Sequence, residues 1–101
     1  MYEVRQKEYV TNSEKGVSLE RLGRYRYVYR HMERLLILFN ESGEAVSGGY
    51  AINIQFPKSM RWEFPYNGEP IEKEEAEKIK SNIREALAVL VPDAQIAFFE
   101  G

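Results

Sequence analysis

The sequence EKEEAEKIKSNIREALAVL at residues 72–90 repeats its apolar side chains at intervals of three and four positions. Those side chains are Ala76, Ile79, Ile83, Ala86, Leu87 and Leu90. This spacing is typical of a helix with one apolar face. Glutamates occupy the first turns, where the positive end of the helix dipole favours carboxylates. We therefore predict an amphipathic helix over residues 72–90, about 28 Å long, that ends before Pro92.

Upstream of this helix the apolar pattern changes to the alternation of β-strands. Residues 24–30 alternate tyrosine with mostly arginine, which predicts a strand with three half-buried tyrosines on one face. Residues 35–39 form an unbroken apolar run, residues 40–44 indicate a turn, and residues 46–56 return as a partner strand. A further alternation at residues 60–64 predicts one more strand.

Within the returning strand, the pair Gly48-Gly49 predicts a β-bulge or a backbone crossing. The apolar residues of 94–99, after the helix, predict a short final strand. Residues 1–24 carry weaker signals, and we assign them no structure.

Together these elements predict one α+β domain over residues 1–101. It consists of an antiparallel β-sheet of about five or six strands with one long C-terminal helix packed on one face and a short final strand. Residues 35–39 are apolar on both faces of their strand, so a second layer is expected there. The N-terminal segment, a second copy of the chain or a partner protein could supply it.

The composition limits the chemistry that this chain can carry. Its 101 residues include no cysteine and one histidine, His31, which argues against disulfides, zinc sites and thiol nucleophiles. We predict no catalytic residues, no metal and no cofactor, and therefore no enzyme. The polar start of the chain resembles no signal peptide, and no apolar run spans a bilayer, so we expect a cytoplasmic protein without membrane contact.

Charge is distributed unevenly along the chain. Residues 1–61 contain ten Lys/Arg and seven Asp/Glu, whereas residues 62–101 contain four and nine. Such a field steers charged partners toward one end of a protein. In residues 24–30 the basic and aromatic side chains fall on opposite faces, which disfavours nucleic-acid binding. Tyr27 remains a candidate protein contact because tyrosine often anchors interfaces.

The segment MRWEFPYNGEP at residues 60–70 concentrates the only tryptophan, two prolines and an Asn-Gly turn. We interpret it both as a strand anchored in the core by Trp62 and as a stiff partner-binding loop with its other side chains outward. The residues selected as candidate partner contacts are Trp62, Glu63, Tyr66, Asn67, Glu69, Glu72, Glu74 and Tyr27.

A family resemblance rests on the last 40 residues. Trp62-Glu63-Phe64-Pro65, Glu69-Pro70-Ile71, Glu74-Glu75, Ile79 and residues 82–87 resemble the immunity proteins of bacterial polymorphic toxin systems, in particular the family numbered seventy-four. The resemblance implies a protein that binds a cognate toxin domain and blocks it by occlusion. Because such toxins are often nucleases with basic sites, it also implies docking through the acidic C-terminal part.

Three alternatives remain open from the sequence. The chain could be a non-catalytic interaction domain of other origin, including a homodimer that uses the apolar face of its sheet. It could be a small nucleic-acid-binding domain, or a small enzyme that uses glutamate and tyrosine side chains.

Overall fold

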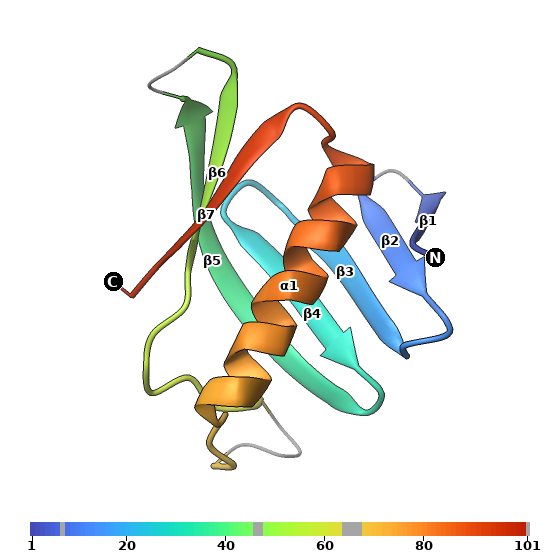
Figure 1. Cartoon of the computed structure of the whole chain (residues 1–101), viewed down its shortest axis with the longest axis vertical. Coiled ribbons are helices and arrows are strands. Elements are labelled where there is room, and N and C mark those ends of the chain that lie inside the picture. Colours follow the sequence, from blue (N-terminus) through green and yellow to red (C-terminus); the bar gives the residue numbers. More distant parts are fainter. Residues whose placement is uncertain (7, 46–47, 64–67, 101) are drawn as a thin grey trace.

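One sheet and one helix make up the part of the chain that the computed structural model describes, which is residues 1–6, 8–45, 48–63 and 68–100 (Figure 1). The elements in chain order are β1 Glu3–Gln6, β2 Tyr9–Asn12, β3 Val17–Leu22, β4 Arg26–His31, β5 Arg34–Glu44, β6 Tyr50–Gln55, α1 Lys73–Leu90 and β7 Ala94–Phe99. The α+β architecture, the helix and the final strand are confirmed. The expected five or six strands are too few, because the sheet has seven.

The strands lie side by side in the order in which the chain makes them, and every pair from β1 to β6 is antiparallel. The last strand, β7, pairs with β6 in parallel. The expected antiparallel sheet is therefore confirmed from β1 to β6, and the final strand, whose direction the sequence left open, is parallel. The 18 residues of α1 carry the chain back along the sheet, so β7 starts from the same end as β6.

Strand β5 is longer than its sequence suggests. The predicted turn at residues 40–44 is part of the strand, which pairs with β4 over residues 34–39 and with β6 over residues 40–44. The chain turns after Ala45 instead, where Gly48 and Gly49 adopt φ values of 87° and 84° that glycine favours. Hydrogen bonds join the Gly48 N–H to the Ala45 carbonyl and the Ala45 N–H to the Gly49 carbonyl, so both glycines lie in the connection between β5 and β6 and not in a bulge within a strand.

The strand predicted at residues 60–64 is also absent from the described part of that segment. Its one ladder contact is an isolated antiparallel bridge between Arg61 and Pro70. The Trp62 N–H donates to the Glu69 carbonyl at 3.3 Å, and the Glu63 N–H donates to the Leu35 carbonyl at 2.9 Å. The segment is thus tied to its own continuation and to the start of β5.

The core lies between α1 and one face of the sheet. From the helix, Ile79, Ile83 and Leu87 are buried, and from the N-terminal strands Val10 and Leu19 are fully buried against them. Full burial of each such aliphatic side chain stabilises the folded state by about 1.5–3 kcal/mol. Strands β1 to β3, in the region left unassigned from the sequence, therefore extend the sheet beneath the helix.

Helix α1 has the bounds expected from its periodicity to within one residue, with Glu72 as its N-cap. Of the three tyrosines predicted to be half-buried on one strand face, Tyr27 and Tyr29 are almost completely buried under α1. Tyr25 is exposed because it precedes β4 in the turn. Among the described residues, no helix is long and apolar enough to cross a membrane.

Candidate functional site

The glutamates selected from the sequence lie near the start of α1. Glu63, Glu69, Glu72 and Glu74 are all exposed. Glu69 forms an ion pair with Arg34, whose guanidinium carbon also lies 5.7 Å from the centre of the Trp62 ring. Arg34 pairs across the hairpin with His31, so Glu69 is held at the β4–β5 end of the sheet.

A shallow groove of about 750 Å³ runs between the first half of α1 and the ends of β3 and β4. Its acidic wall consists of Glu72, Glu74 and Glu75, and His31 and Lys15 lie among the residues opposite. The structure thus brings Glu72 and Glu74 together at one groove, here called the acidic groove. Within the described residues there is no cluster of three or more His, Asp or Glu side chains suited to a metal ion.

Two of the candidate contacts lie in the core. Trp62 and Tyr27 are each only 2% exposed, so a docked partner does not reach either side chain. The prediction that they contact a partner is corrected, because both belong to the hydrophobic core, and the expectation that Trp62 anchors the core is confirmed. Tyr66 and Asn67, also selected from the sequence, lie outside the described residues.

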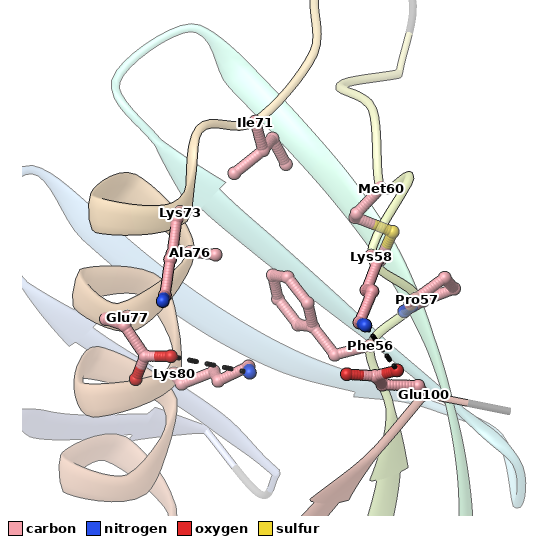
Figure 2. A pocket seen from close by; sticks show the side chains of 10 residues that line it. All are labelled: Phe56, Pro57, Lys58, Met60, Ile71, Lys73, Ala76, Glu77, Lys80 and Glu100. Atoms are coloured by element: carbon pink, nitrogen blue, oxygen red, sulfur yellow. Dashed lines mark ion pairs between the residues drawn. The ribbon is translucent and has the colours of Figure 1, made fainter.

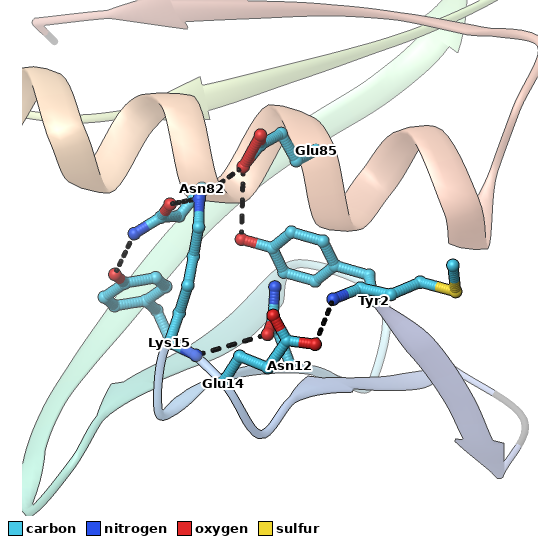
Figure 3. A network of polar contacts seen from close by, with 8 residues as sticks. Tyr2, Asn12, Glu14, Lys15, Asn82 and Glu85 are labelled. Atoms are coloured by element: carbon cyan, nitrogen blue, oxygen red, sulfur yellow. Dashed lines mark hydrogen bonds and ion pairs between the residues drawn. The ribbon is translucent and has the colours of Figure 1, made fainter.

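A polar network joins the N-terminal strands to α1 beside the acidic groove (Figure 3). From the β2–β3 turn, the Lys15 ammonium donates to the Glu85 carboxylate at 3.0 Å and to the side-chain amide oxygen of Asn82 at 3.2 Å. The Tyr2 hydroxyl donates to the same Glu85 carboxylate at 3.4 Å. Burial and the negative charge of Glu85 raise the pKa of Tyr2, so its hydroxyl stays protonated as a donor.

The face of the sheet that points away from α1, here called the open face, carries exposed apolar side chains. Leu22 pairs with Arg26, and Arg26 pairs with Phe39, so the three form one row across β3, β4 and β5. We call it the Phe39 row. Leu22 is 46% exposed and Phe39 is 53% exposed.

Strand alternation places the row on the open face, since the neighbours Tyr27 and Leu38 are buried toward α1. Phe99 of β7 alternates with Phe98 in the same way and is also exposed. No described element other than the sheet itself covers this face (Figure 1). The sequence signal that anticipates it is the apolar run at residues 35–39, which leaves Leu35, Ile37 and Phe39 on this side of β5.

Comparison with known proteins finds no relative of this chain. No protein-family model, no curated protein and no solved structure matches the chain.

Proposed function

We propose that this chain is a binding protein of the immunity class, which docks a toxin domain on its open face and blocks that domain by occlusion. The observation that carries the proposal is the Phe39 row. Protein interfaces concentrate aromatic and arginine side chains at their centres. Here an exposed phenylalanine and an exposed leucine flank an exposed arginine, Arg26, on a flat support of paired strands.

The Phe39 row forms a rigid docking surface because its three residues belong to paired strands. All three side chains stand on ladder positions of antiparallel strands, with β4 hydrogen-bonded on both sides. A surface held in this way orders few groups on binding, which lowers the entropic cost of association. Interfaces of the usual size bury about 800 Å² per partner, and the Phe39 row, at the β3–β4 hairpin end of the open face, supplies the apolar contacts for such an interface.

The support for a toxin as the partner comes from the sequence resemblance together with the acidic groove. Glu72 and Glu74 at the helix start create a negative field at one end of the molecule. This field attracts a basic toxin domain to the protein at long range. The acidic groove lies at the Val17–His31 end of β3 and β4 and the Phe39 row at the Leu22–Arg26 end, so the row alone supplies the contacts that hold the toxin.

The decisive experiment is co-expression with the toxin domain encoded by the neighbouring reading frame. We expect the chain to restore growth and to form a complex with the purified domain. Phe39→Ser is expected to weaken that complex by more than tenfold, as for a central interface residue, with an unchanged melting temperature. Val89→Ser, at an exposed position of α1, is the matched control and should bind as the wild type does.

Two outcomes would contradict the proposal. If the purified toxin domain and the chain do not associate, the immunity function is wrong. If the isolated chain is a dimer that Phe39→Ser converts to a monomer, the open face joins two copies of this chain, and the homodimer alternative replaces the toxin.

A further inference from the structure

A pocket of about 410 Å³ lies between the first two turns of α1 and the segment that follows β6 (Figure 2). Its floor is apolar: Phe56 and Ile71 are buried core residues, and Met60 and Ala76 pack beside them. The volume falls within the range of about 300–1,000 Å³ usual for small-molecule sites. None of the lining residues belongs to the Phe39 row or to the acidic groove.

The rim of the pocket is charged. Three ammonium groups, of Lys58, Lys73 and Lys80, and two carboxylates, of Glu77 and Glu100, surround the apolar floor (Figure 2). We call it the lysine pocket.

Two of these ammonium groups lie near a carboxylate but beyond hydrogen-bond distance. Lys58 lies 3.8 Å from Glu100, and Lys80 lies 3.8 Å from Glu77. Hydrogen bonds between ammonium and carboxylate groups are about 2.7–2.9 Å long, so both contacts are charge pairs without a hydrogen bond. The two lysines therefore keep N–H donors for an anion that enters the pocket.

Lys80 is the side chain that sets the chemistry of the site. Its side chain is only 23% exposed, which is unusual for a lysine. The ammonium lies 5.2 Å from the centre of the Phe56 ring and 5.9 Å from that of Phe98. Cation–π contacts of this kind compensate a desolvated charge only in part. A bound carboxylate that accepts a hydrogen bond from the Lys80 ammonium, on the side that faces the apolar floor, would compensate the charge more fully.

We propose that the lysine pocket binds a small monocarboxylic acid with a short apolar body. The carboxylate accepts hydrogen bonds from Lys80 and Lys73, and the apolar body packs on Phe56, Met60 and Ile71. Three ammonium groups and two carboxylates give the rim a net charge of +1, which one monoanion balances. A phosphate dianion would leave an excess negative charge beside Glu77 and Glu100. This inference extends beyond toxin binding and does not depend on it.

The experiment is a titration of the full chain with 3-phenylpropanoate at neutral pH, followed in amide proton–nitrogen NMR spectra. We expect shifts at Phe56, Met60 and Ala76, and none along the Phe39 row. The neutral analogue 3-phenylpropanol should bind about tenfold more weakly, because it offers no charge-assisted hydrogen bonds. The dianion 2-phenylethyl phosphate should also bind more weakly than the carboxylate.

The variant Lys80→Met keeps the length of the side chain and removes the charge. It should weaken carboxylate binding about tenfold and leave alcohol binding unchanged, whereas Lys78→Met, on the acidic groove, should change neither. Equal affinity for the acid and the alcohol in the wild type would overturn the proposal, and so would unperturbed pocket resonances at millimolar acid. The comparison of the two ligands needs no variant, so it remains decisive even if Lys80→Met fails to fold.

Discussion

The side-chain amide of Asn82 on α1 donates a hydrogen bond to the hydroxyl of Tyr29 on β4 at 3.1 Å. The bond joins the helix to the middle of the sheet at a site where Tyr29 is 1% exposed. Lys15 contacts the same Asn82 from the β2–β3 turn, so helix, central strand and N-terminal strands meet at one side chain. The network therefore fixes the position of α1 and, with it, the shape of the acidic groove.

Removing this hydroxyl should cost stability without disturbing the packing. For Tyr29→Phe we expect a loss of about 1 kcal/mol in the free energy of unfolding, since the half-buried Asn82 amide loses its acceptor. Tyr25→Phe is the control, because Tyr25 is 59% exposed in a turn and should lose almost nothing. Urea denaturation of the three proteins measures the difference, and equal midpoints for wild type and Tyr29→Phe would contradict the assigned bond.

The buried tyrosines also predict a loss of stability at alkaline pH. Burial raises the pKa of Tyr27 and of Tyr29 above the ordinary value of 10.0, although Arg21 and the Asn82 hydrogen bond respectively oppose the shift. Unfolding therefore releases protons once the pH exceeds about 10, so their contribution is complete below this pH and declines above it. Unfolding free energies should fall less steeply between about pH 9 and pH 11 in a Tyr27→Phe/Tyr29→Phe double variant than in the wild type.

The elements with a local, uniform signal could be predicted from the sequence. Residues 72–90 repeat their apolar side chains with helical period, and the helix begins at Lys73. The last strand, Ala94–Phe99, is predicted with its observed bounds, because Pro92 separates it from the helix and all its residues except Gln95 are apolar. In both cases one short-range pattern decides the structure.

The parts that could not be predicted depend on distant partners. Residues 40–44 contain Asn, Ser and Gly, which favour turns, yet they pair with β6 because β5 changes partner at Asn40. Asn40 itself is 3% exposed, which no local rule anticipates. The parallel alignment of β7 likewise depends on where the helix returns the chain.

For the candidate site, the sequence found the acidic side chains but misjudged two aromatic ones. Glu72 and Glu74 are exposed at one groove, as glutamates at a helix start are expected to be. Tyr27 was selected because tyrosine often anchors interfaces, but the same apolar area also fills cores. Trp62 was selected with the 60–70 segment, although the sequence also predicts that it anchors the core. Whether an aromatic residue lies in the core or at the surface depends on which face of the strand it occupies and on whether α1 covers that face. The residue type reveals neither.

The core position of Trp62 can be tested by fluorescence. We expect weak acrylamide quenching in the native protein and a red shift of the emission on unfolding, because the indole is 2% exposed. Trp62→Ala should lower the free energy of unfolding by about 3–5 kcal/mol. Trp62→Phe should lose less, since among the described residues no acceptor meets the buried indole N–H. Quenching as strong as in the unfolded chain would place Trp62 at the surface.

The last prediction separates steering from contact in the proposed toxin complex. Neutralising the acidic groove in Glu72→Gln/Glu74→Gln should lower kon several-fold at low ionic strength and leave koff unchanged, because neither side chain belongs to the open face. Phe39→Ser should do the reverse and mainly raise koff. The control pair Glu3→Gln/Glu14→Gln removes the same charge from exposed positions at the N-terminal end and should alter kon less.

Stopped-flow association at increasing salt concentration measures kon and koff for these variants. The difference in kon between the groove variant and the wild type should vanish at about 1 M salt, where the screening length is only about 3 Å. A raised koff in the groove variant would show instead that Glu72 and Glu74 touch the partner, and would move the docking surface from the open face to the acidic groove.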